Sequence, residues 1–379
     1  MIDPESHEKL GEEISMRIME DRDLLNELRT EIHPLKDQVR RIHSRTTTSI
    51  SLVGTDGGNN KIEYNPFLIQ LIRVVDSSNN EYCLEAISTS SRIRELNKQH
   101  IKDGQPLTAM GELMAFLNVD SLHQLSPMIR LNEGDDMASP SWVQVYREIT
   151  EWAILFNIIR KKEFGSDTLI VFDGLLRSKV FTGDLFRRLL NGIEEAITSH
   201  RRKTRRRIYL VGLAKHSKVL ARYRLAMQLE NVMNVPYPCY VEIPRDIEAR
   251  SYAWQEYARG ADLEIEGQEI NKFVGGKMFF VKFGKSIHDP IWPVDIFVPQ
   301  ANEAPAIMGY LLADAENGFP VPFYPLCLQK AHENAALVDF DFDVLQDQIF
   351  EGIRKLLGDD STVLDIARFQ NTDPSQRRY

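Results

Sequence analysis

The pattern of hydrophobic and polar positions divides the chain into a helical beginning, a middle in which strands and helices alternate, and a less regular last third. Residues 5–45 contain few glycines, and their apolar residues recur every three, four or six positions, which is typical of an amphipathic helix. Pro34 is expected to break or kink this helix. We expect it to pack on the body of the protein or on a partner subunit. Its apolar positions are Leu10, Ile14, Ile18, Leu24, Leu28, Ile32 and Leu35.

Three apolar runs follow, at residues 49–55, 67–76 and 81–88, with turn residues between them. Runs of this length predict strands, and the "SSNN" sequence between the second and third run is typical of a tight turn. The three runs therefore predict three strands in meander order.

Helices and strands then alternate. Within a mixed region at 89–140, "LTAMGELMAFLN" predicts a short helix, and "SWVQVYREITEWAILFNIIRKK" predicts a longer one with Ser139 or Ser141 as its cap. The run "DTLIVFDGLL" predicts a strand that ends at Asp173. A helix over 182–200, the strand "RIYLVGLA" and another helix follow. This order indicates an α/β fold, a mixed sheet flanked by helices.

The last third predicts a strand pair, "GKMFFVKFGK" and "WPVDIFVP", then the helix "APAIMGYLLADAENG" and one or two closing helices. The chain thus divides into an N-terminal helical segment at 1–45, a body at 46–358 with an insertion near 89–140, and a polar C-terminal tail at 359–379. The helical segments at the two ends are additions to the α/β body.

The length, hydrophobic content and cysteine spacing of the chain exclude several classes of protein. The 379 residues, 43% of them hydrophobic, suffice for one large or two ordinary domains. No apolar run is long enough to span a membrane, and the acidic start "MIDPESHEKLGEE" is unlike a signal peptide, so we expect a cytoplasmic protein. Cys83, Cys239 and Cys327 form no CxxC pair, which argues against a disulfide framework or a cysteine zinc site.

The net charge of -9 argues against non-specific coating of nucleic acid, yet "RRKTRRR" at residues 201–207 places six cations in seven positions. Such a cluster is suited to a polyanion, because each cation that neutralises a phosphate releases counterions. The alternative is a solvated helix end whose cations complement the helix dipole. The sequence leaves both interpretations open.

Two predicted strands end in Asp-Gly, at Asp56 and at Asp173. The carboxyl ends of parallel strands meet at one edge of an α/β sheet, where acidic side chains can hold a metal ion that bridges phosphate oxygens. Asp-Gly is also a common turn dipeptide, so each aspartate alone is explained as well by a turn. The pair in this strand order favours a metal site.

A two-metal site needs a further oxygen ligand, and three glutamates are candidates. Glu148 and Glu151 lie three positions apart on one face of the helix before the second Asp strand, in an otherwise apolar segment where an unpaired carboxylate is costly to bury. Glu112 in "AMGELMAF" is the third candidate. A solvated helix face is the alternative for each.

These motifs resemble a known family. A meander with Asp on its first strand, a Glu-bearing helix and a strand that ends in Asp resemble the RNase H-like fold. More narrowly, "VGTDGG", "YREITEW", "LIVFDGLL", "GLAKHSK" and "YPLCLQKAHENA", spread over residues 45–345, resemble the NurA family. NurA proteins are nucleases that work with the hexameric ATPase HerA in DNA end resection.

The resemblance implies roles for particular residues. The catalytic set would be Asp56, Glu151, Asp173, Tyr324 and His332, of which all but Tyr324 would bind metal, with Glu148 and then Glu112 as alternatives to Glu151. A less certain K-x-S element would be Lys215 and Ser217, binding DNA together with the cluster residues Arg201, Arg202 and Arg205. The chain departs from the family at Gly58, where the family often has Ser.

The resemblance implies a Mn²⁺- or Mg²⁺-dependent deoxyribonuclease, with 5′–3′ exonuclease and single-strand endonuclease activity in double-strand break repair. Its partners would be DNA and a HerA-like hexameric translocase, and we expect a homodimer that packs through the N-terminal helix. The alternative is an RNase H-like adaptor that binds DNA or the ATPase without catalysis. The sequence has no P-loop or dinucleotide-binding motif, so ATP would act through a partner.

Overall fold

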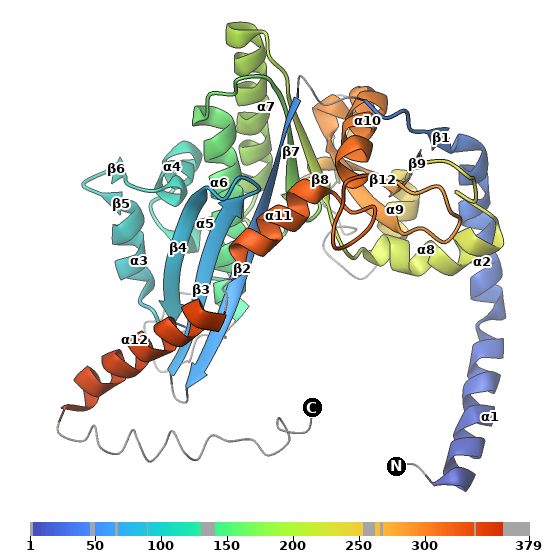
Figure 1. The fold of residues 1–379 in the computed structure, drawn as a ribbon, viewed down its shortest axis with the longest axis horizontal. Coiled ribbons are helices and arrows are strands. Elements are labelled where there is room, and N and C mark those ends of the chain that lie inside the picture. Colours follow the sequence, from blue (N-terminus) through green and yellow to red (C-terminus); the bar gives the residue numbers. More distant parts are fainter. Residues whose placement is uncertain are drawn as a thin grey trace.

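The computed structural model describes residues 3–45, 50–64, 67–88, 90–129, 141–252, 262–265, 268–336 and 339–358. Within these residues a nine-stranded sheet, in the order β1-β9-β12-β13-β8-β7-β2-β3-β4, carries helices on both faces (Figure 1). The predicted α/β class, a mixed sheet flanked by helices, is confirmed. None of the described helices is long and apolar enough to cross a membrane.

One half of the sheet has the strand order that the RNase H-like fold requires. The meander strands are antiparallel, β7 pairs parallel to β2, and β8 pairs parallel to β7, which gives the order β4-β3-β2-β7-β8. The prediction of an RNase H-like fold is therefore confirmed. The strands are β2 (Ile50–Tyr64), β3 (Phe67–Asp76), β4 (Glu81–Ser88), β7 (Asp167–Asp173) and β8 (Ile208–Leu213).

The first strand corrects one prediction. We expected a strand at 49–55 that ends at Asp56, but β2 continues through Asp56, Gly57 and Gly58 to Tyr64. Gly57 pairs with Val74 of β3, so the hydrogen-bond ladder of the hairpin continues where the Asp-Gly dipeptide suggested a turn. Pairing with a neighbouring strand outweighs local turn preference here.

The other half of the sheet is antiparallel and confirms the predicted late strand pair as β12 (Gly276–Lys282) and β13 (Ile291–Phe297). β13 pairs with β8, and β12 pairs with β9 (Cys239–Glu242). The edge strand β1 (Arg40–Arg41) comes from the N-terminal segment, which thereby joins the main sheet. Two small hairpins lie outside it, β5 (Ile101–Lys102) with β6 (Gln105–Pro106), and β10 (Asp262–Ile265) with β11 (Gln268–Asn271).

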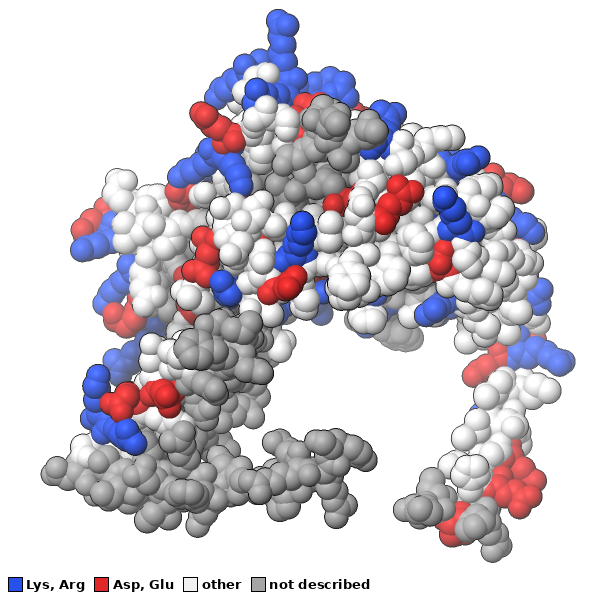
Figure 2. Space-filling model, viewed as in Figure 1, with Lys and Arg blue, Asp and Glu red and all other residues white. Residues whose placement is uncertain are grey.

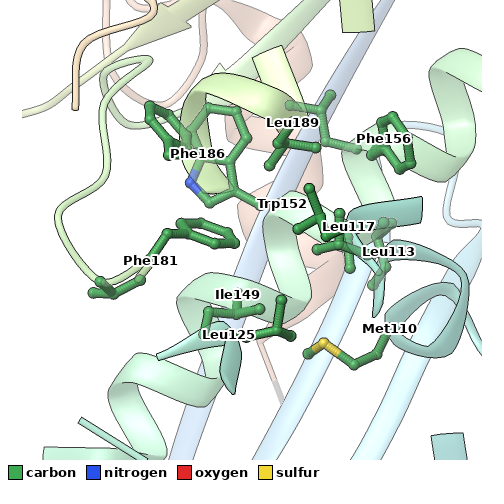
Figure 3. Close-up of a cluster of buried hydrophobic side chains, with 14 of the residues drawn as sticks. Met110, Leu113, Leu117, Leu125, Ile149, Trp152, Phe156, Phe181, Phe186 and Leu189 are labelled. Carbon is green, nitrogen blue, oxygen red and sulfur yellow. The ribbon is translucent and has the colours of Figure 1, made fainter. Parts of the chain in front are cut away.

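Trp152 marks the core on one face of the RNase H-like half (Figure 3). Its ring lies 4.9 Å from the rings of both Phe172 on β7 and Phe186 on α7. The insertion adds the buried Leu113 and Leu117 to the same core, so it packs as part of the body. The helices here are α3 (Ile93–His100), α4 (Ala109–Leu117), α5 (Leu122–Leu125), α6 (Ser141–Lys161) and α7 (Leu185–Thr204); the candidate cap Ser139 lies outside the described residues, as does the side chain of Ser141.

The opposite face carries α10 (Ala304–Ala315) and α11 (Leu326–Ala335), with α11 lying across the sheet in Figure 1. Strand β7 alternates between the two cores: Leu169 and Val171 face these helices, whereas Ile170 and Phe172 face α6 and α7. A third core joins β9 and β12 to α2 (Arg22–Ile32), α8 (Lys218–Leu229) and α9 (Arg245–Ser251).

The N-terminal segment differs from the single kinked helix that we expected. It forms α1 (Pro4–Glu20), α2 and a 3₁₀ helix (His33–Gln38) that contains Pro34. Leu28, Ile32 and Leu35 are buried against the body, but α1 extends away from it (Figure 1). The chain also forms a second 3₁₀ helix (Val298–Glu303) and α12 (Asp339–Leu357); the polar tail at 359–379 lies outside the described residues.

Candidate functional site

Asp173 is the last residue of β7 and lies at the carboxyl edge of the sheet, as predicted. By strand alternation its side chain continues the row of Leu169 and Val171 toward α10 and α11. Gly174 follows with φ +127°, a conformation that favours glycine. A Cβ on Gly212 of β8 would lie 2.4 Å from the carbonyl oxygen of Gly174, so this tight turn also requires a glycine beneath it.

Asp173 contacts two of the other predicted residues. The Tyr324 hydroxyl donates to Asp173 Oδ1 at 3.5 Å, and Lys215 Nζ lies 3.4 Å from Oδ2. The Tyr324 ring is buried and lies 4.8 Å from the ring of Trp292, whose Nε1 donates to the carbonyl oxygen of Phe323 at 2.6 Å. The fold thus joins three chain segments at one carboxylate.

Asp56 lies next to Asp173 in the backbone register. The last paired residues of β2 and β7 are Thr55 and Phe172, and Asp56 and Asp173 come directly after them. Neighbouring strands lie about 4.8 Å apart, so the two backbones are adjacent. The structure describes the backbone of Asp56 and not its side chain, so its role as a metal ligand stays a prediction.

His332 lies on α11, exposed to solvent. The helix begins just after Tyr324, and near its end Asn334 Nδ2 donates to the carbonyl oxygen of Asp76 at 3.2 Å. Because Asp76 pairs with Thr55, α11 runs from Asp173 to the backbone beside Asp56. Tyr324 and His332 therefore belong to one continuous segment, which contacts Asp173 at one end and the backbone beside Asp56 at the other.

The glutamate candidates on α6 lie beneath the other face of the sheet. Glu148 accepts a hydrogen bond from Ser178 Oγ at 2.5 Å, five residues after Asp173. Burial raises the pKa of the Glu148 carboxyl, and the Ser178 hydrogen bond opposes this rise. Glu151 forms an ion pair with Arg147 at 3.3 Å.

Glu112 lies elsewhere. It accepts a hydrogen bond from Asn157 Nδ2 at 2.6 Å and pairs with Lys161, so it joins α4 to the C-terminal end of α6. Lys161 is 13 positions beyond Glu148 (161 − 148), about 20 Å along the helix axis at 1.5 Å per residue. The structure therefore places Glu148, and not Glu112, beside the segment that follows Asp173.

The donor atoms that remain suit a hard cation. Each Asp173 oxygen has one long contact in the described part of the chain, which leaves lone pairs for a metal such as Mn²⁺ or Mg²⁺. The described residues contain no group of three or more His, Cys, Asp or Glu side chains placed to hold a metal ion. The side chain of Asp56, the other predicted aspartate ligand, lies outside those described.

The predicted DNA-binding residues fall into two groups. Lys215 contacts Asp173, and Ser217 caps α8, where its Oγ accepts from Val219 N at 3.2 Å and from Leu220 N at 3.4 Å. The basic cluster lies at the opposite end of β8, with Arg201, Arg202 and Lys203 in the last turn of α7 and Arg205 directly after it. Figure 2 shows Lys and Arg side chains gathered at this tip.

Two contacting residues were missed by sequence reasoning. Ser178, fully buried, fixes the Glu148 carboxyl, and Trp292 packs on the Tyr324 ring. Trp292 carried a weak signal, because a large aromatic residue begins the "WPVDIFVP" run. Ser178 carried none, since its importance depends on where the loop after β7 meets α6.

Neither a protein-family model nor a curated protein matches the chain. Solved structures do show similarity. Structures of NurA are among them. The structure "Crystal structure of the NurA nuclease from Sulfolobus solfataricus" has a TM-score of 0.49 and 12% identity over 94% of this chain and 99% of its own. The NurA structure bound to dAMP and manganese has a TM-score of 0.39 and 10% identity over 89% of this chain and 94% of its own. Similarity at this level transfers neither residue roles nor activity.

Proposed function

We propose that this protein is a metal-dependent deoxyribonuclease that hydrolyses phosphodiester bonds at the carboxyl edge of β7. The observation that supports this most is the Asp173 carboxylate, held between Lys215 and Tyr324 next to the backbone of Asp56. A pair of aspartates on neighbouring parallel strands, with a lysine beside one of them, is suited to a metal ion and a phosphate.

The residues divide the work by their chemistry. Asp173 and Asp56 would hold Mn²⁺ or Mg²⁺, with Glu148 or Glu151 and His332 as further candidates. Such an ion, when bound, activates water and stabilises charge on the phosphate. Lys215 would contact a phosphate oxygen by charge, and the Tyr324 hydroxyl would orient the Asp173 carboxylate.

Several finer parts of the proposal follow from the family resemblance of the sequence. They are 5′–3′ exonuclease and single-strand endonuclease activity, partnership with a HerA-like hexameric ATPase, and a role in DNA end resection. Self-association is supported by α1, whose apolar side chains are exposed, among them Ile14 (50%) and Ile18 (66%). We propose a homodimer that packs through this helix.

A second candidate function is an adaptor that binds DNA without cleaving it. Glu148 and Glu151 lie on α6, which packs on the face of the sheet opposite to Tyr324, so the structure does not bring a glutamate into contact with Asp173 among the described contacts. A protein that binds DNA through the proposed DNA-binding residues but has no complete metal site would be such an adaptor.

The decisive experiment is cleavage of labelled single-stranded DNA in Mn²⁺ by the wild type and by Asp173→Asn and Asp56→Asn. Each substitution keeps the side-chain shape but removes a charge that would hold the metal, so we expect the rate to fall about 100-fold or more. Mn²⁺ should also raise the melting temperature of the wild type and leave that of Asp173→Asn unchanged, since only the form that binds metal is stabilised.

The matched control is Asp184→Asn, an exposed aspartate before α7 that makes no side-chain cap hydrogen bond, and it should keep full activity. Full activity in both site variants would overturn the proposal. DNA binding by a wild type that neither binds Mn²⁺ nor cleaves DNA would favour the adaptor.

A further inference from the structure

A large open cavity lies beside the candidate site. It has a volume of about 1100 Å³ and is bounded by α8, by the end of β12 and by the segment from Ile287 to Trp292. Pockets that hold one drug-sized ligand measure roughly 300–1,000 Å³, so this cavity has room for more than a single nucleotide.

The lining of the cavity is cationic, although the chain as a whole has a net charge of -9. Four lysine or arginine side chains and two histidines line it, and Asp289 is the one acidic lining residue among those described. Asp289 Oδ2 already accepts from the backbone N–H of Ser286 at 2.6 Å. The cations are Lys215, Lys218, Arg224 and Lys282, and the histidines are His216 and His288.

Lys282 is the least expected of these residues. It lies on β12 with 1% of its surface exposed, and its Nζ donates to the carbonyl oxygen of Val235 at 2.6 Å. An ammonium group has three donors, and no described carboxylate forms an ion pair with Lys282. Burying a charge in this way is costly unless an anion completes its surroundings.

The cavity connects directly to Asp173. Lys215 lines the cavity and lies 3.4 Å from Asp173 Oδ2, and Trp292 lines it while packing on Tyr324. From there the cations continue along α8, where Lys218 and Arg224 are six residues apart, about 9 Å along the helix axis. The cationic side chains therefore extend from the candidate site along α8 over a length that can contact more than one phosphate of a DNA strand.

We propose that this cavity binds the phosphate backbone of a few nucleotides of single-stranded DNA on one side of the bond to be cleaved. Arg224, Lys218 and Lys282 hold phosphates, and Trp292 offers an apolar wall for a base. This inference rests on the proposed function for the choice of DNA as the ligand. It adds a strand-binding subsite whose proposed phosphate contacts, Lys218, Arg224 and Lys282, lie outside the predicted catalytic and DNA-binding set.

The test is binding of fluorescein-labelled (dT)12 without divalent metal, measured by anisotropy from 50 to 200 mM salt. Arg224→Gln should weaken binding about tenfold, the equivalent of one charge-assisted hydrogen bond. It should also lower the slope of log Kd against log salt by about 0.7, the value for one phosphate contact on a single strand. Lys218→Gln with Arg224→Gln should lower the slope by about 1.4.

The matched control is Arg222→Gln, an exposed arginine two residues away on α8 that lies outside the cavity lining. It removes the same charge, so equal effects of Arg222→Gln and Arg224→Gln would overturn the proposal by showing a general electrostatic effect. Unlabelled (dT)4 should compete better than thymidine monophosphate. Equal competition by the two would also overturn it, since it would indicate a pocket for free nucleotides.

The two proposals fail separately. Metal-dependent cleavage together with equal binding by the Arg224 and Arg222 variants would reject the subsite and keep the nuclease. Absence of cleavage, with weakened binding only in the Arg224 and Lys218 variants, would reject the nuclease and keep the strand-binding cavity.

Discussion

His100 is a fully buried titratable side chain whose two ring nitrogens both have partners. Nε2 lies 2.8 Å from the Tyr146 hydroxyl, which itself donates to Glu85 Oε2 at 2.6 Å, and Nδ1 lies 2.8 Å from Thr108 Oγ1. A neutral ring that donates from Nε2 and accepts at Nδ1 satisfies all these contacts. The insertion is thereby joined to α6 and β4.

This network makes stability depend on pH. Burial lowers the pKa of His100 below its ordinary value of 6.5, so the unfolded chain takes up a proton more readily than the folded one. The stability that neutral His100 contributes is present above pH 6.5 and is lost as the pH falls below it.

We expect His100→Gln to lower the free energy of unfolding by about 1–2 kcal/mol at pH 7 because hydrogen bonds are lost. The difference in unfolding free energy between the variant and the wild type should be smaller at pH 5 than at pH 7. The reason is that the wild type loses the contribution of neutral His100 as the pH falls, whereas glutamine does not titrate. Urea unfolding at several pH values measures this, with the exposed His7→Gln as control. Parallel curves for His100→Gln and the wild type would contradict it.

At the scale of elements, α1 and α2 share an amphipathic pattern but have different surroundings. In α2, Leu28 and Ile32 pack in a core with α8, whereas the α1 residues Leu10, Ile14 and Ile18 are 42%, 50% and 66% exposed. An apolar stripe on a helix that leaves the body is suited to a second copy of the same helix.

If α1 forms the proposed dimer contact, Ile14→Glu with Ile18→Glu should convert the dimer to a monomer, because charges would enter an apolar interface. Molar mass from light scattering measures this. Lys9→Glu changes the net charge by the same two units away from the stripe and should leave the mass unchanged. An unchanged mass in the Ile14 and Ile18 variant would show that the helix does not hold the dimer.

At the scale of the whole molecule, a buried ion network joins distant parts of the fold near the candidate site. Arg177, in the loop after β7, binds Asp295 of β13 through Nη2 at 2.7 Å and Glu248 of α9 through Nη1 at 2.7 Å. The Leu176 backbone N–H donates to Asp295 Oδ2 at 3.0 Å. The network fixes the loop whose next residue, Ser178, holds Glu148.

Arg177→Met should lower the free energy of unfolding by about 3–5 kcal/mol at pH 7, because the buried Asp295 and Glu248 lose the guanidinium that they share. Arg245 still pairs with Glu248 in this variant. Burial raises the pKa of Asp295 and the guanidinium opposes that rise, so without Arg177 the folded state binds a proton more readily. The loss of unfolding free energy in Arg177→Met, relative to the wild type, should therefore be smaller at pH 5 than at pH 7. Guanidinium chloride unfolding at both pH values measures this.

The control is Arg354→Met, which removes an exposed arginine that pairs with the exposed Glu351 on α12. It should change stability far less, because exposed ion pairs are screened by water. A similar loss in both variants, or a deficit for Arg177→Met that grows at pH 5, would contradict the role of the buried network.

The sequence by itself determined the features that depend on neighbouring residues. Alternation and helical spacing fixed the meander, the strand that ends at Asp173, and helices such as α6 and α10. The resemblance of short motifs also selected Asp173, Lys215 and Tyr324, which do lie together. The predictions of strands and helices held because periodicity depends on residues that are close in the sequence. The roles of the three site residues stay predictions.

Only the tertiary structure decided what depends on distant partners. It extended β2 past Asp56, because β3 supplied the hydrogen bonds that a turn would have removed. It also separated the α6 glutamates from the face of Tyr324, tied Glu112 to Lys161, and placed the buried Lys282 beside α8 in a cationic cavity. A side chain's neighbours across a sheet come from segments tens to hundreds of residues away, and spacing along the chain does not record them.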